Sequence, residues 1–161
     1  IVGESTALAR LQRDCETYKA TNVMLLPFEP REKLPEMLAA ADVSLVVQKR
    51  RVTNFNMPSK IQVLLASGRA ILASVPETGT AHKAVQQSGG GVVVTPEDPQ
   101  ALADGVEDLY LNPAKLEALG LQGRSYAVEN YGFEEALNQY EALFTLVTAR
   151  GGEKVLEPLP K

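Results

Sequence analysis

Short apolar runs alternate with segments of helical spacing along the whole chain. The apolar runs lie at residues 1–3, 23–26, 43–47, 70–74 and 92–94. Continuous apolar runs of about five residues are typical of strands that are buried on both faces. Between and after these runs, apolar residues recur at helical spacing, which predicts helices over residues 6–20, 34–41, 57–67, 80–88, 99–111, 113–131 and 133–149.

Wholly apolar strands separated by helices predict an α/β fold, a doubly wound parallel sheet with helices on both faces. In such sheets, ligands bind beyond the carboxyl ends of the strands. The candidate site is therefore expected in the loops that follow residues 3, 26, 47 and 74. We expect one domain over residues 1–150 and a tail over residues 151–161. A chain that opens inside a strand is also expected to be a fragment of a larger, two-domain protein.

Composition narrows the classes of function. The chain has 161 residues, of which 45% are hydrophobic, and a formal net charge of −4. The hydrophobic content excludes global disorder, and the mild acidity argues against a nucleic-acid partner. No apolar run approaches the roughly 20 residues of a membrane span. A single cysteine and a single histidine exclude a disulfide framework and any Cys-cluster or multi-His metal site.

The segment Asn56-Met57-Pro58-Ser59-Lys60 is the strongest candidate for binding chemistry. Pro58 suits the first turn of a helix, whose free N–H groups attract anions. Ser59 can donate a hydrogen bond to a phosphate oxygen, and Lys60 adds a mobile positive charge. Together these groups suit a diphosphate. An ordinary helix start with a solvated lysine is the alternative.

Three further segments offer weaker candidates. Arg51 follows Lys49 and Arg50 in a polar loop and could neutralise phosphate charge, although a solvated basic loop is the alternative. Gly3 forms a turn after the first strand, where a phosphate loop competes with simple capping by Ser5 or Thr6. No GxGxxG fingerprint is present.

Phe28 and Glu29 lie between two prolines, after the second apolar run. Backbone groups there could meet a nucleotide base, with Phe28 lining the pocket. The alternative is a rigid connection with Phe28 in the core.

Other reactive side chains are assigned structural roles. Thr78 or Thr80 is expected to cap the helix over 80–88, and His82 inside it is expected to be a surface residue. Cys15 lies on an apolar helix face, where a buried, inert thiol is expected. The carboxylates of the last three helices fall mostly on polar faces, so no nucleophile or acid/base pair is assigned and the catalytic residues stay unidentified.

Several segments, in their order, carry a resemblance to a known family. They read Ile-Val-Gly-Glu at 1–4, Asn-Val-Met-Leu-Leu-Pro-Phe at 22–28, Leu-Pro-Glu-Met-Leu-Ala-Ala-Ala-Asp-Val at 34–43, Met-Pro-Ser-Lys-Ile-Gln-Val-Leu-Leu-Ala-Ser-Gly at 57–68, and Gly-Gly-Gly-Val-Val-Val-Thr-Pro-Glu-Asp-Pro at 89–99. Over residues 1–149 the chain resembles the C-terminal half of a GT-B glycosyltransferase of family 4. The likeness is to the branch that makes exopolysaccharide and colanic-acid-type glycans.

The resemblance implies a Rossmann-like sheet whose first strand is missing, followed by C-terminal helices. It implies that this half binds a UDP- or GDP-linked sugar donor, with the diphosphate near Pro58, Ser59 and Lys60 and the base near Phe28 and Glu29. The reaction would retain anomeric configuration without metal or other cofactor. A missing N-terminal half would bind the acceptor, so the fragment alone is expected to be inactive. The whole enzyme would be cytoplasmic, with peripheral membrane association through that missing half.

Two positions depart from the family pattern. Two glutamates that the family often carries, eight positions apart, fall on Phe55 and Val63. The second of these normally holds the ribose hydroxyls. Their loss leaves two alternatives open: a non-catalytic binding or assembly module, and a GT-B sugar-nucleotide epimerase.

Overall fold

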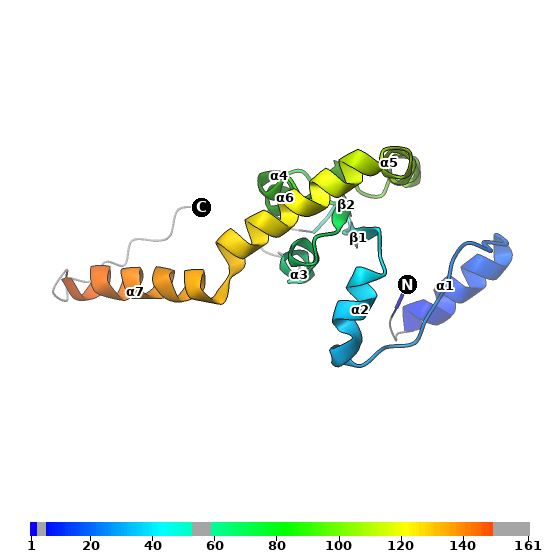
Figure 1. The fold of residues 1–161 in the computed structure, drawn as a ribbon. Coiled ribbons are helices and arrows are strands. Elements are labelled where there is room, and N and C mark those ends of the chain that lie inside the picture. The colour runs from blue at the N-terminus through cyan, green and yellow to red at the C-terminus, as the bar shows by residue number, and fades with distance from the viewer. Residues whose placement is uncertain (3–5, 53–58, 150–161) are drawn as a thin grey trace. The chain divides into compact units, whose positions relative to one another are not determined.

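The computed structural model describes residues 1–2, 6–52 and 59–149 of the chain. These residues fall into two compact units, one within Ile1–Ala41 and one within Asp42–Lys161. Figure 1 traces the elements of both units along the chain.

The first unit contains two helices and one strand pairing. Helix α1 spans Thr6–Thr17, a short 3-10 turn η1 spans Arg31–Lys33, and α2 spans Leu34–Ala39. The strands predicted at 1–3 and 23–26 reduce here to a single parallel bridge between Val2 and Leu26. Two short strands without further partners are marginal, which explains why the apolar runs do not extend the pairing.

Side chains of the first unit are more exposed than their spacing predicts. Neither η1 nor α2 contains a buried residue. Cys15 is half-buried, so the expectation of a buried thiol is wrong. Phe28 is 69% exposed, which contradicts its alternative placement in a core. A unit of this size offers few apolar neighbours against which such side chains can pack.

The second unit is built on a parallel sheet. Strands β1 (Val43–Val47), β2 (Ala70–Ser74) and β3 (Gly91–Val94) lie in the order β1-β2-β3. Val43 aligns with Ala70 in the first pair, and Ala73 aligns with Val93 in the second. Every residue of β2 is buried, as expected of an apolar strand in the centre of a sheet covered by helices. The predicted α/β class is confirmed.

Five helices accompany this sheet (Figure 1). They are α3 (Lys60–Ala66), α4 (Thr80–Ser88), α5 (Pro99–Leu111), α6 (Pro113–Tyr131) and α7 (Phe133–Ala149). The largest fully buried side chains are Ile61, Leu65, Ile71, Leu72, Val75, Val85 and Leu109. Helices α3 to α6 all contribute contacts with the sheet, so one apolar core joins them to it.

Local signals set the helix boundaries. Gly68 and Gly89 follow the ends of α3 and α4 with positive φ angles of 73° and 59°, a conformation that favours glycine. Asp98 caps α5, because its carboxylate accepts a hydrogen bond from the backbone N–H of Ala101 at 3.0 Å. Pro99 and Pro113 open α5 and α6 at positions where no N–H is needed.

Helix α7 differs from the other helices of the second unit because none of its residues is buried. Its main contacts are with α6. Its exposed large apolar side chains are Phe133, Leu137, Tyr140, Leu143, Phe144, Leu146 and Val147. Neither α7 nor any other helix in the described part of the chain is long and apolar enough to cross a membrane.

Candidate functional site

The carboxyl ends of the three strands meet at one edge of the sheet. The backbone N–H of Gln48, after β1, donates to the Ser74 carbonyl at 2.9 Å. The Ser74 hydroxyl in turn donates to the carbonyl of Thr95, after β3, at 3.3 Å. These bonds hold the loops after β1, β2 and β3 beside one another, at the edge where parallel α/β sheets bind ligands.

Ser59 and Lys60 lie where α3 begins in this unit. Ser59 is the N-cap residue, yet its side chain makes no capping hydrogen bond. Both residues are exposed. Lys60 forms no ion pair with any described residue, so its ammonium group is available to an anion.

Arg51 lies in the polar loop after β1. The backbone N–H of Val52 donates to the Lys49 carbonyl at 3.0 Å, which closes a turn around Arg50 and Arg51. Arg51 is exposed and in no ion pair with the part of the chain that the structure describes.

The remaining predicted donor-binding residues lie outside the described residues or in the first unit. Gly3, Asn56 and Pro58 lie outside the described residues, as does Phe55. Phe28 and Glu29 belong to the first unit, where a Glu29 carboxylate oxygen lies 3.7 Å from Lys33 Nζ. Their roles toward a nucleotide stay predictions.

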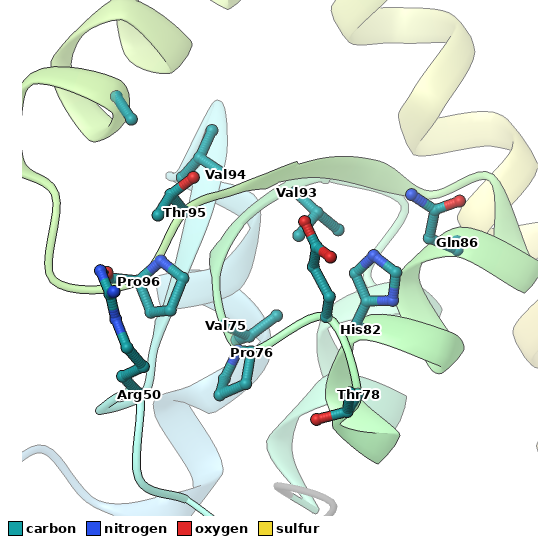
Figure 2. Close-up of a pocket in the computed structure, with 12 residues that line it drawn as sticks. Arg50, Val75, Pro76, Thr78, His82, Gln86, Val93, Val94, Thr95 and Pro96 are labelled. Carbon is teal, nitrogen blue, oxygen red and sulfur yellow. The ribbon is translucent and has the colours of Figure 1, made fainter.

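A pocket of about 620 Å³ opens at the same edge of the second unit (Figure 2). It combines residues of the loops after β1, β2 and β3 with residues of β3, α4 and α5. Its lining residues are Arg50, Val75, Pro76, Glu77, Thr78, His82, Gln86, Val93, Val94, Thr95, Pro96 and Ala101. This volume is within the range of about 300–1,000 Å³ that is usual for small-molecule sites.

Arg50 is fixed at the pocket by two contacts with the loop after β3. Its guanidinium Nη2 donates to the Pro96 carbonyl at 3.2 Å. Its backbone N–H donates to Glu97 Oε2 at 3.3 Å. The guanidinium has no carboxylate partner among the described residues, so its charge is not neutralised by the fold.

The start of α4 differs from the prediction. Gly79, and not Thr78 or Thr80, occupies the N-cap position, and no side chain caps the helix. The Gly79 N–H donates to the Pro76 carbonyl at 2.9 Å, which closes a tight turn. Thr80 Oγ1 is buried and makes no hydrogen bond. The turn places Gly79 at the cap and moves Thr80 into the helix, which is why the capping prediction is wrong.

Sequence reasoning missed most of this pocket. It treated His82 as a surface residue, whereas His82 is half-buried and lines the pocket. The available signal was spacing, because His82 and Gln86 are four residues apart within one predicted helix. Residues four apart share one face of a helix.

No group of three His, Cys, Asp or Glu residues that could hold a metal ion occurs among the residues described. The carboxylates of the last helices make local surface contacts, as their polar faces predict. Asp108, for example, lies 2.6 Å from Lys115 Nζ and also accepts a hydrogen bond from Asn112.

Comparison with known proteins identifies relatives of this chain. Residues 1–126 match the family described as "Glycosyl transferases group 1". The chain is 30% identical over 141 residues to "Putative colanic acid biosynthesis glycosyl transferase WcaI" of Escherichia coli (strain K12), covering 87% of this chain and 34% of WcaI. It is 30% identical over 133 residues to the "GDP-mannose-dependent alpha-(1-6)-phosphatidylinositol monomannoside mannosyltransferase" of Mycolicibacterium smegmatis (strain ATCC 700084 / mc(2)155), covering 81% of this chain and 35% of the relative.

Solved structures agree on the fold. Anabaena Alr3699/HepE in complex with UDP aligns with a TM-score of 0.74 at 18% identity, over 89% of this chain and 40% of that one. The chain spans about a third of the length of the curated relatives it matches. Because the family match covers most of the sequence, the chain belongs to the group 1 glycosyl transferases, and its fold is that of the GT-B enzymes among its structural neighbours.

Proposed function

We propose that this chain is the donor-binding half of a retaining glycosyltransferase that transfers a sugar from a UDP- or GDP-linked donor to a glycan or lipid-linked acceptor. The family match over residues 1–126 carries this proposal. Two relatives support the donor class: HepE was solved with UDP and with UDP-glucose, and the mycobacterial relative is named as GDP-mannose-dependent.

Lys60 is the residue that we assign to the donor diphosphate. It is exposed at the start of α3, in the loop region that follows β1, and no described carboxylate competes for it. Negative charge develops on the nucleotide diphosphate as it departs. The Lys60 ammonium group and the Ser59 hydroxyl would stabilise that charge. This role requires no metal and no cofactor beyond the donor itself.

Acceptor binding is assigned to the larger part of the enzyme, since this chain spans about a third of its curated relatives. We therefore expect donor binding without sugar transfer by this chain alone. A polysaccharide precursor is the acceptor that the likeness to WcaI favours. We place the whole enzyme in the cytoplasm, at the inner membrane face where a lipid-linked acceptor is available.

Calorimetric titration tests donor binding. UDP, GDP, UDP-glucose and GDP-mannose are titrated into the chain, into Lys60→Ala and into Lys83→Ala, which removes an exposed lysine of α4. We expect saturable binding of one nucleotide class and a loss of about tenfold or more in Lys60→Ala, because a charge-assisted hydrogen bond contributes about 1.5–3 kcal/mol. Lys83→Ala should bind as the unmodified chain does. Equal affinity in Lys60→Ala would remove the diphosphate assignment.

One observation favours a second candidate, a non-catalytic binding or assembly module. Val63 occupies the position of a family glutamate, and its side chain is 43% exposed on α3. An exposed valine cannot hold ribose hydroxyls. If none of the four nucleotides binds at millimolar concentration, this candidate replaces the first.

A further inference from the structure

We propose that the pocket formed by Arg50, Pro76, His82, Gln86 and Pro96 binds a sugar that carries a single anionic group. Lys60 is not among the residues that line this pocket, so the proposal does not rest on the proposed donor binding. All of its lining residues belong to the second unit.

Arg50 provides the anion-binding group. Its guanidinium lines the pocket, and its contact with the fold is one hydrogen bond from Nη2 to the Pro96 carbonyl. Guanidinium presents five N–H donors in a planar fork, so most of them stay available. Carboxylates and phosphates are the acceptors that match this fork, often through two parallel hydrogen bonds.

The opposite side of the pocket provides groups for hydroxyls. Figure 2 shows His82 and Gln86 of α4 on one side and Arg50 beside Pro96 on the other, with Val75, Pro76 and Val93 between them. A neutral imidazole and an amide can each both donate and accept hydrogen bonds. Hydroxyl groups do the same, so these side chains suit a hydroxylated ligand.

The aliphatic residues of the pocket suit a sugar ring in particular. Val93 and Val94 are half-buried and line the pocket, whereas Val75, Pro76 and Pro96 are buried behind its surface. A pyranose ring has aliphatic C–H faces and a rim of hydroxyls, so it fits a site with aliphatic residues and polar ends. Small-molecule pockets commonly combine an apolar lining with a few placed polar groups.

The charges around the pocket limit the ligand to a weak anion. Glu77 lines the pocket with Arg50, and Glu97 accepts a hydrogen bond from the Arg50 backbone. Arg50 and Glu77 give the lining one positive and one negative formal charge. A carboxylate, with one charge, therefore suits the site better than a phosphate monoester, whose charge is close to two at pH 7.

The single histidine of the chain makes a direct test possible, because its ring protons give unique NMR signals. Glucuronate, glucose 6-phosphate, inorganic phosphate, glucose and UDP are titrated into the full chain while the His82 signals and the backbone amides are followed. We expect saturable shifts of His82 and of residues 93–96 with glucuronate and weaker binding of glucose 6-phosphate. Glucose and inorganic phosphate should each bind at least about tenfold more weakly than glucuronate.

Two variants assign the contacts. Arg50→Ala keeps the backbone N–H that bonds to Glu97, so the loop should stay folded, and it should reduce glucuronate affinity about tenfold without changing the weak response to glucose. Gln86→Ala should weaken glucuronate and glucose alike. Lys83→Ala removes a positive charge from the same helix outside the pocket and should bind glucuronate unchanged.

Several results would overturn the proposal. Absence of saturable shifts with all four non-nucleotide probes would do so, as would equal glucuronate affinity in Arg50→Ala. Inorganic phosphate binding as tightly as glucuronate would show that no sugar ring is recognised. UDP shifting His82 in an Arg50-dependent way would make the pocket part of the donor site. Loss of UDP binding in Lys60→Ala, with glucuronate binding kept, separates the two proposals.

Discussion

Gly90 and Gly123 lie in direct backbone contact: a Cβ added to Gly90 would lie 2.7 Å from the Cα of Gly123. Both glycines are buried, one just before β3 and the other in α6. A Cβ on Gly123 would also lie 3.0 Å from the Leu65 side chain of α3. This close approach lets α6 pack on α3 and on the sheet that carries both candidate sites.

Gly123→Ala tests this close approach. The added methyl group would lie 3.0 Å from Gly90 Cα and from the Leu65 side chain, so these neighbours must give way, which typically costs about 1–3 kcal/mol in a well-packed core. Alanine also favours a helix over glycine by about 1 kcal/mol, so urea denaturation measures which of the two effects decides the free energy of unfolding. Leu121→Ala is the control, because Leu121 is 64% exposed on the same helix and should change stability by less than about 0.5 kcal/mol. A loss of stability beyond that of the control would show that Gly90 and Leu65 cannot give way to the methyl group, and a gain would show that they can.

Arg124 joins α6 to the end of α3. Its Nη1 donates to the Ala66 carbonyl at 2.6 Å, one of the carbonyls that a helix end leaves without a partner. Arg124→Ala should lower the free energy of unfolding by about 1 kcal/mol in urea denaturation. Glu117→Ala, on an exposed position of α6, should have little effect. An equal effect of both substitutions would contradict a specific role for this bond.

Tyr131 should make stability depend on pH in the alkaline range. Burial, and then the neighbouring Tyr126 phenol, raise the pKa of Tyr131 above its usual 10.0. The rings of Tyr126 and Tyr131 meet edge to face, with centroids 5.7 Å apart. The folded state thus holds the phenolic proton more tightly than the unfolded state does. The resulting stabilisation is present below pH 10 and is lost as pH rises through the raised pKa.

Tyr131→Phe should remove the part of the stability loss at alkaline pH that comes from the raised pKa of Tyr131. Urea denaturation from pH 8 to pH 11 checks it: the slope of the free energy of unfolding above about pH 10 should be shallower in Tyr131→Phe. Tyr110→Phe is the matched control, since Tyr110 is 80% exposed, and its slope should equal that of the original chain. A slope unchanged in both variants would contradict the raised pKa.

Local signals explain how much of the fold could be predicted. The bounds of β1, β2 and α4 to α7 match the predicted ranges, because apolar runs, opening prolines and closing glycines lie within each element. The first unit was less predictable. Its apolar runs at 1–3 and 23–26 look like strands, but a strand needs a partner, and only Val2 and Leu26 pair. Pairing is a property of neighbours, which no local pattern encodes.

The Ser59–Lys60 site and the pocket also differ in how far the sequence predicts them. Ser59 and Lys60 were predictable because they are adjacent in sequence at a helix start. The pocket was not, because it joins Arg50, Pro76 and Pro96 from three loops. Their proximity follows from the register of β1, β2 and β3, which fixes which loop ends meet. The capping prediction at Thr78 or Thr80 failed for a smaller reason, the turn that places Gly79 at the cap.

Val63 gives the sharpest test of the donor site. It lies three residues after Lys60 on α3 and is 43% exposed, so both side chains lie on one face of the helix. The family resemblance assigns the ribose hydroxyls to a glutamate at this position. Val63→Glu should therefore increase affinity for UDP or GDP by about tenfold or more, since hydrogen bonds to a charged group contribute about 1.5–3 kcal/mol.

The gain should depend on the ribose. Calorimetry with the 2′,3′-dideoxy form of the same nucleoside diphosphate should show no increase in Val63→Glu, because the hydroxyls are absent. Val63→Gln, which keeps the shape of glutamate without its charge, should give a smaller gain with the ribonucleotide. A gain of equal size with the dideoxy nucleotide would mean that the new carboxylate acts by reorienting Lys60. In that case, position 63 would not face the ribose, and the donor would lie across α3 differently from the family pattern.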